Sequence, residues 1–435
     1  MSSVSSAISF EARTFEEQTY AKVTWRIIPL LFLCYVVAYL DRVNVGFAKL
    51  QMLGDLKFSE TIYGLGAGMF FVGYCLFEVP TNLLLYRVGA RKVMTRIMIT
   101  WGTISALTMF VTTPMQFYVV RFFLGVAEAG FFPGIILYLT YWFPAERRGR
   151  IIALFMTAVP ASGIVGGPLS GWILNHFSGV NGWAGWQWLF LLEGIPTILI
   201  GIVVWFYLDD GISSARWLSD EQKRLLQQKI DGDGSVQADH SFKQSLRNPK
   251  VWILGLMYFG VVTGLYGISF WLPTLIKATG INNPLDVGLL SAIPYIAAVV
   301  AMVLVGVSAD KRLERRWHFA VPAILGSLGL ILSTIFADNT AFALAALTLA
   351  SAGIIASLPL FWTFPPNFLS GAAAAGGIAL IGALGNVGGF VSPYAVGFVK
   401  DLTRSTDGGM YFLAAVVFMS AILALACMPA RLVNR

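Results

Sequence analysis

Charged side chains, histidine and cysteine are all scarce in this chain of 435 residues. Asp, Glu, Lys and Arg together make up 12% of it, and there are three histidines and three cysteines. Cys34, Cys75 and Cys427 lie far apart in apolar stretches, which predicts neither a disulfide nor a metal site. No nucleophile or metal-ligand spacing surrounds the histidines. We therefore expect no enzyme activity, no metal and no cofactor.

Two processing signals are also missing. Residues 1–20 are polar and acidic, without the apolar segment and small-residue cleavage site of a signal peptide. We expect the first apolar run to act as its own insertion signal. The sequence has no Asn-x-Ser/Thr glycosylation site, which favours a bacterial source.

Apolar residues dominate instead, at 57% of the chain. A soluble protein of this length cannot bury that much apolar surface, so the expected solvent is lipid. Runs of about 20 apolar residues are long enough to cross a bilayer as helices. Their length and lack of alternating polarity argue against a β-barrel. Twelve such runs predict an all-α membrane protein: 25–47, 63–85, 97–112, 117–139, 154–176, 186–208, 252–276, 287–307, 319–336, 341–360, 374–399 and 410–428.

One long hydrophilic insert, residues 209–250, divides the runs six and six. This division predicts an N-terminal six-helix bundle at 1–208, a cytoplasmic linker at 209–250 and a C-terminal six-helix bundle at 251–435. Within the linker, Ser219-Asp-Glu-Gln-Lys-Arg-Leu-Leu is typical of a capped amphipathic helix.

The net charge of +7 sets the topology rather than indicating a nucleic-acid partner. Lys and Arg concentrate in the termini and alternate loops, which by the positive-inside rule places both termini in the cytoplasm. For this chain we expect a multi-pass protein of the bacterial inner membrane. The opposite loops hold few basic residues: Lys49, Lys57, Lys277, Lys400 and Arg404.

Four of the charges inside the apolar runs form the main candidate site: Asp41, Arg42, Arg121 and Glu128. Each costs at least ~2.5–3.5 kcal/mol at the centre of a membrane helix, so their presence indicates that the structure or the function of the protein requires them. The helical rise places Asp41 about 10 Å and Arg121 about 9 Å below the outer surface, so they can lie at one level. Arg121 and Glu128 are seven residues apart and share one helix face.

These charges have two interpretations. The simpler one is that they form a permanent structural ion pair. The other is a site where a charged cargo and a proton cross the membrane together, because desolvation and a nearby arginine act in opposite directions on a buried carboxyl group. We favour the cargo and proton site for Asp41, Arg121 and Glu128, and less strongly for Arg42, which points about 100° away from Asp41.

Two further acids, Glu78 and Glu193, are assigned structural roles. The spans of the second half carry no charge, so the expected cargo contacts there are uncharged. The Asn in Gly385-Asn-Val-Gly-Gly is the most suggestive of them, since lone aromatic residues are usually packing. The candidates are Tyr258, Tyr266, Tyr295, Trp362 and Asn386.

The stretches that contain these residues resemble the major facilitator superfamily, and within it the anion:cation symporter family. Three of the stretches that carry the resemblance are Tyr39-Leu-Asp-Arg-Val-Asn, Arg121-Phe-Phe-Leu-Gly-Val-Ala-Glu-Ala-Gly-Phe-Phe-Pro-Gly and Trp188-Leu-Phe-Leu-Leu-Glu-Gly-Ile-Pro. The superfamily's loop signature matches at Gly306, Asp310, Lys311, Arg315 and Arg316, which the resemblance assigns to gating. Its first-half copy departs from the pattern, with Asn82 where Gly is usual and Tyr86 where Asp is usual.

The resemblance implies a rocker-switch carrier whose first, fourth, seventh and tenth spans line a central cavity. It implies that Asp41 and Glu128 couple the proton. The cargo would be a small organic anion such as a sugar acid, tartrate, phthalate or hydroxyphenylacetate. Residues implied to contact it are Arg42, Arg121, Tyr39, Tyr74 and Asn386, and Tyr266 and Trp362 join them as the uncharged candidates of the second half.

We therefore expect a monomeric, proton-coupled symporter that imports a carboxylate. One alternative is a proton/solute antiporter, because Gly163-x-x-x-Gly167-Pro168-x-x-Gly171 partly matches an antiporter signature. Trp172 interrupts that match, and two cavity arginines favour anions over cationic drugs. A second alternative is a transporter-like anion sensor, although residues 209–250 are too short for a separate output domain.

Overall fold

The computed structural model describes residues 2–232, 247–368 and 372–434. Every regular element in these ranges is helical, and twelve spans are long and apolar enough to cross a membrane. Both the all-α class and the twelve predicted spans are confirmed. The first-half helices are α1 Ser2–Val43, α2 Val45–Leu56, α3 Glu60–Val88, α4 Ala90–Leu107, α5 Pro114–Glu128, α6 Phe131–Thr140, α7 Ala145–Met156, α8 Ala158–His176 and α9 Gly185–Tyr207.

The second-half helices follow the linker helix α10, Asp220–Asp231. They are α12 Pro249–Ala278, α13 Pro284–Arg312, α14 Arg316–Ile335, α15 Thr340–Phe361, α16 Ala372–Thr403, α17 Asp407–Cys427 and the short α18 Ala430–Val433. Four 3-10 turns lie between helices: η1 Thr108–Phe110, η2 Val180–Gly182, η3 Ile212–Ser214 and η4 Pro365–Asn367.

Three of the apolar runs contain a boundary between two helices. The first span passes from α1 to α2 at Asn44 and the fifth from α7 to α8 at Thr157, and both residues keep right-handed helical angles. In the fourth span α5 stops at Glu128, and Gly130 takes a left-handed conformation (φ 82°) before α6 begins. Glycine alone adopts that conformation without a Cβ penalty, so the sequence sets the break directly after Glu128.

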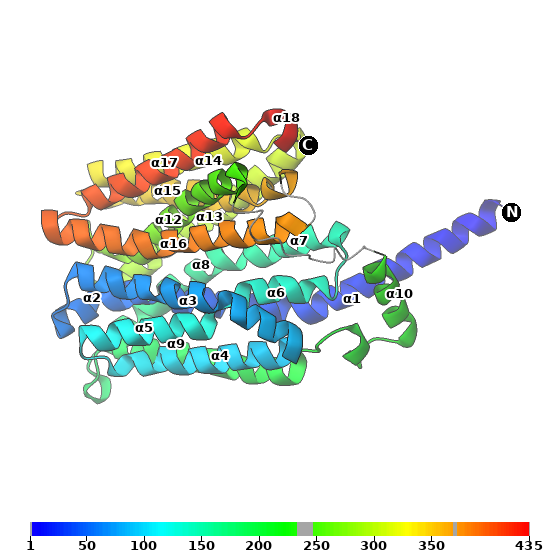
Figure 1. The fold of residues 1–435 in the computed structure, drawn as a ribbon. Helices are drawn as coiled ribbons and strands as arrows, with labels where there is room; N and C mark the ends of the chain where they lie inside the picture. The colour runs from blue at the N-terminus through cyan, green and yellow to red at the C-terminus, as the bar shows by residue number, and fades with distance from the viewer. Residues whose placement is uncertain (1, 233–246, 369–371, 435) are drawn as a thin grey trace.

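The first-half and second-half helices meet along two long seams, α3 against α16 and α8 against α13. Figure 1 shows the two sets as layers, with the blue and cyan first-half helices below the orange and red second-half ones. Both chain termini lie at one end of the helices, here called the termini end (Figure 1). The other end, with α2 and the start of α3, is called the opposite end.

A charged cluster joins the two halves at the opposite end. The carboxylate of Glu60, at the start of α3, lies 2.7 Å from Lys49 Nζ and 2.5 Å from Lys400 Nζ of α16. Lys49 also sits 3.3 Å from the ring centroid of Trp271, in α12. Asp401 accepts hydrogen bonds from the first backbone N–H groups of α3. These contacts close the opposite end of the molecule.

The predicted linker helix is confirmed as α10. Its N-cap is Ser219, whose hydroxyl accepts from the Gln222 N–H while the Gln222 side chain returns to the Ser219 N–H. Lys229 of α10 forms an ion pair with Glu16 of α1, at 3.0 Å. The helix therefore packs against the first half at the termini end.

Candidate functional site: buried charges in the first half

The four intramembrane charges are all buried. Arg121 and Glu128 are 0% exposed, Asp41 is 1% exposed and Arg42 is 7% exposed. Local sequence places them there. Thr113 and Gln116 form a capping box that starts α5, so its buried face carries both Arg121 and Glu128 down to the break at Gly130. The expectation that Arg121 and Glu128 share one face agrees with this burial.

Arg42 is the cation that binds Glu128. Its Nη2 forms an ion pair with Glu128 Oε1, and its Nη1 donates to the Tyr266 hydroxyl of α12 at 2.6 Å. The guanidinium also lies 5.5 Å from the Tyr74 ring centroid. Arg42 therefore links α1 and α5 of the first half to α12 of the second half.

Asp41 is held by neutral groups. Its carboxylate accepts from Ser105 Oγ of α4 at 3.1 Å, from Thr197 Oγ1 of α9 at 3.0 Å and from Asn44 Nδ2 at 3.3 Å. No salt bridge to Asp41 forms among the described residues. The similar depth of Asp41 and Arg121 therefore does not bring them into a pair, because their helices turn these side chains toward different neighbours.

Arg121 has no hydrogen-bond acceptor in the part of the chain that is described. None of its three guanidinium nitrogens donates to a described protein atom, and the Phe70 ring lies 5.3 Å from the guanidinium carbon. Arg42 lies 5.1 Å from the same ring. A buried, unpaired guanidinium is costly, so an anion that met its N–H groups would be bound strongly.

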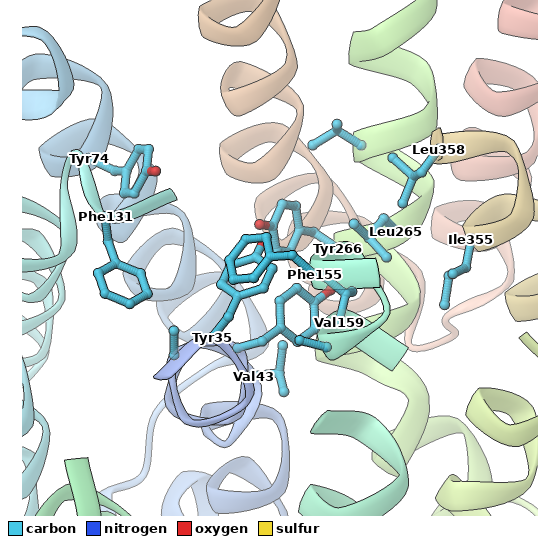
Figure 2. Packing of buried hydrophobic residues seen from close by; sticks show 14 of the residues in the cluster. Tyr35, Val43, Tyr74, Phe131, Phe155, Val159, Leu265, Tyr266, Ile355 and Leu358 are labelled. Carbon is cyan, nitrogen blue, oxygen red and sulfur yellow. The ribbon is translucent and has the colours of Figure 1, made fainter. Parts of the chain in front are cut away.

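The aromatic and second-half candidates separate into two groups. Tyr39 stacks near Tyr266 at 6.3 Å, and Tyr74 faces Arg42, so these three tyrosines surround the charges. Figure 2 shows Tyr266 near the centre of this packing and Tyr74 on the α3 side. Trp362 packs on Tyr258 at 4.9 Å, and Asn386 donates to Glu78 at 3.3 Å. No hydrogen bond among the described residues joins Trp362 or Asn386 to either arginine.

Several contacts of the site are not foreseen from sequence. The hydroxyls of Ser105 and Thr197 are the main donors to Asp41, and the one signal for them is their place inside apolar runs. Lys49, predicted to lie in a loop, is instead 4% exposed within α2. Lys49 is therefore a further buried charge, at the opposite end rather than beside Arg121.

Comparison with known proteins identifies the family. The sequence model of the family described as "Major Facilitator Superfamily" matches residues 31–393. The chain belongs to this superfamily. Members of it are membrane transporters, so the chain is a multi-pass membrane transporter and not an enzyme.

Three relatives indicate the range of named functions. The "Putative metabolite transport protein NicT" of Pseudomonas putida is 50% identical over 418 residues, covering 96% of this chain and 95% of the relative. A "Putative tartrate transporter" of Agrobacterium vitis is 48% identical, covering 94% of each chain. A "Quinolone resistance transporter" of Acinetobacter baumannii is 41% identical, also covering 94% of each.

Among solved structures, a crystal structure of a D-xylose-proton symporter matches with a TM-score of 0.71. The match covers 93% of this chain and 98% of that one, at 16% sequence identity. At that identity it shows the fold alone, and it places the twelve helices in the major facilitator arrangement.

The superfamily loop signature lies at the termini end. Arg315 forms a 2.5 Å ion pair with Asp310, and Arg316 donates to the Leu425 carbonyl. The backbone N–H groups of Arg315 and Arg316 both donate to Asn434 Oδ1, at 2.9 and 3.3 Å. A Cβ built on Gly306 meets nothing within 4 Å, so no close contact in this conformation requires glycine there. The signature thus anchors the end of the chain to α14.

Glu314, between the spans, completes this anchor. It accepts from the Trp317 and His318 N–H groups and from Asn434. Partial burial alone would raise its pKa, but these hydrogen bonds outweigh burial and hold the pKa of Glu314 below its usual value. Glu314 is therefore ionised at neutral pH and ties the loop to the C-terminal tail.

Proposed function

We propose that the chain is a proton-coupled symporter that imports a small organic carboxylate by alternating access. The observation that carries the proposal is the fully buried guanidinium of Arg121, which has no described acceptor and lies against the same ring as the Arg42–Glu128 pair. Glu128 pairs with Arg42, so Arg121 has no charged partner among the described residues. A carboxylate cargo supplies that partner, and the planar fork of arginine suits it.

Coupling follows from competition for Arg42. While Glu128 is ionised, it holds Arg42. Protonation of Glu128 removes that charge and releases Arg42 to join Arg121 on the cargo, and protonation of Asp41 lowers the cost of closing the cavity further. Cargo and proton together then favour the closed form more than either does alone, which is the thermodynamic requirement for symport.

Orientation and organisation are part of the proposal. The basic loops lie at the termini end, so by the positive-inside rule this end faces the cytoplasm of a bacterial inner membrane. The charged cluster at Glu60 then closes the outer side. We propose that residues 1–208 and 251–435 move as two bundles of a monomer, joined by 209–250.

Tartrate is the first cargo to test, because two relatives carry that name and its carboxylates match the site. Purified protein is screened by thermal shift against tartrate and other organic acids, since a ligand of the folded form raises its melting temperature. The best ligand is then offered to proteoliposomes with an imposed pH gradient. Symport predicts accumulation inside when the outside is acidic.

A second candidate, proton/solute antiport, is favoured by the relative named a quinolone resistance transporter. The same vesicles separate the two functions. With an acidic exterior, an antiporter depletes the interior of solute, whereas a symporter fills it. Depletion of the ligand that binds best would reject import.

Two variants test the residue roles. Glu128→Gln should abolish accumulation driven by the pH gradient, because it removes the proton that frees Arg42. Arg121→Lys should lower uptake at least tenfold, because lysine lacks the planar fork. Arg96→Lys, on an exposed position of α4, is the matched control. Full gradient-driven accumulation by Glu128→Gln would remove Glu128 from the mechanism.

A further inference from the structure

Glu193, on α9, is a second buried acid near the site and has no part in the mechanism above. Its side chain is 3% exposed. Ser170 Oγ of α8 donates to Glu193 Oε1 at 2.8 Å, while Oε2 has no described partner. A buried carboxylate oxygen without a donor is costly, whereas a carboxylic acid carries its own donor there.

Asn44 lies between Glu193 and Asp41. Its Nδ2 donates to Asp41 Oδ1, its side chain also lies beside the Glu193 carboxyl, and its Oδ1 is buried without a described donor. A proton on Glu193 Oε2 would give that buried oxygen its own donor. Asn44 is the polar side chain that lies between the two acids.

A small cavity connects this place with the seam between the halves. Asn44 and Ser170, which lie against the Glu193 carboxyl group, both line it. Its far wall is formed by Ser269 of α12 and Tyr295 of α13. The volume is about 10 Å³, close to the space that one water molecule needs. Ser269 in turn hydrogen-bonds Tyr39 at 3.1 Å, so polar groups continue toward the arginines.

We propose that Glu193, with Asp41 and Asn44, forms a second proton-binding site that exchanges its proton through this cavity. The proton binds Oε2 of Glu193 and converts a carboxylate into a neutral acid. It leaves to solvent when the α8–α13 seam opens. The inference rests on the proposed function only for the proton's use in transport, and not for its binding.

The surroundings of the acid pair Asp41–Glu193 contain few other charges. From α5, Glu128 and Arg121 act on Asp41 through space. From α4 and α8 the acids receive the neutral hydroxyls of Ser105 and Ser170. From α2, Asp55 binds the indole of Trp186, nearly two turns before Glu193 on α9. The pair therefore titrates mainly against itself and the α5 charges.

The test is infrared titration of purified, ligand-free protein between about pH 5 and about pH 9, following the C=O stretch of protonated carboxyl groups. The proposal predicts a band that is lost as pH rises and is missing at every pH in Glu193→Gln. Glu78→Gln, which alters a partly exposed acid on α3, should leave this band in place. A band that persists at both pH extremes, or the same spectrum with and without Glu193, would overturn the proposal.

Ser170→Ala provides a second variant that changes a single hydroxyl and is expected to fold. Loss of its hydrogen bond to Oε1 should move the Glu193 band to higher wavenumber, and an unmoved band would place the proton elsewhere. These spectra need no cargo. If wild-type vesicles fail to accumulate carboxylates, the proposed function fails while the infrared result still decides the Glu193 site.

Discussion

Asp401→Ala is expected to loosen the opposite end of the molecule. Asp401, on α16 of the second half, accepts from the Glu60 N–H at 3.2 Å and from the Thr61 N–H and hydroxyl at 2.8 and 2.5 Å. These N–H groups are the first of α3, in the other half. A carboxylate of one half therefore caps a helix of its neighbour, and the contact exists only while this end is closed.

The magnitude follows from those three hydrogen bonds. A carboxylate at a helix N-terminus contributes up to ~2 kcal/mol, and charge-assisted hydrogen bonds contribute ~1.5–3 kcal/mol each before screening. Asp401 is partly exposed, so screening reduces the sum to about 2 kcal/mol. At 1.4 kcal/mol per factor of ten, the ratio of open to closed protein at this end should rise about 30-fold.

Spin-label distances measure this ratio. Labels at Gly54→Cys and Leu402→Cys, both exposed near the opposite end, report the separation of α2 and α16 once the three native cysteines are replaced. Asp401→Ala should increase the long-distance population. Asp286→Ala removes an exposed acid from the first turn of α13 and serves as the control. Identical distance distributions for the two variants would refute the capping argument.

Three further predictions concern stability, each measured as the melting temperature of purified protein. Gly288→Ala should destabilise by ~1–3 kcal/mol, because its Cβ would lie 2.3 Å from the α8 backbone. Gly54→Ala, with nothing within 4 Å, should be neutral or slightly stabilising; equal losses in both would contradict the packing argument. Asn434→Ala should lower the melting temperature by removing the partner of Glu314 and of the loop N–H groups; an unchanged value would show that the tail does not anchor α14. Gly130→Ala should cost ~1–2 kcal/mol for its left-handed backbone, and a smaller loss would mean that the break relaxes.

Hydropathy and charge predicted the spans and the buried charges well. Length and composition are sufficient to identify a membrane helix, and a charge inside such a run must lie in the protein interior. The sequence also predicted α10 from its capping residues, because a cap is a local signal. The break at Gly130 was missed, since a window of 20 residues averages over a single turn.

The pairing of the charges could not be predicted in the same way. Helical rise gives depth, but the rotation of a helix about its axis is set by packing against its neighbours. Arg42 therefore reaches Glu128, while Asp41, at the adjacent position, turns to the hydroxyls of α4 and α9. Lys49 was misplaced for a related reason: α2 continues the first span, so a residue predicted to lie in a loop is covered by Trp271 and Tyr63.

The seam between α8 and α13 has a consequence for how the halves move. At its centre Gly167 and Gly288 face each other, and a Cβ built on either meets main-chain atoms of the other helix. Tyr295 of α13 packs over Gly163 of α8 nearby, but at Gly167 and Gly288 main chain lies against main chain, so few side chains there would have to change rotamer if one helix moved over the other. Such a contact places no requirement on the residues around the arginines, so the cargo site can change in sequence without altering this part of the seam.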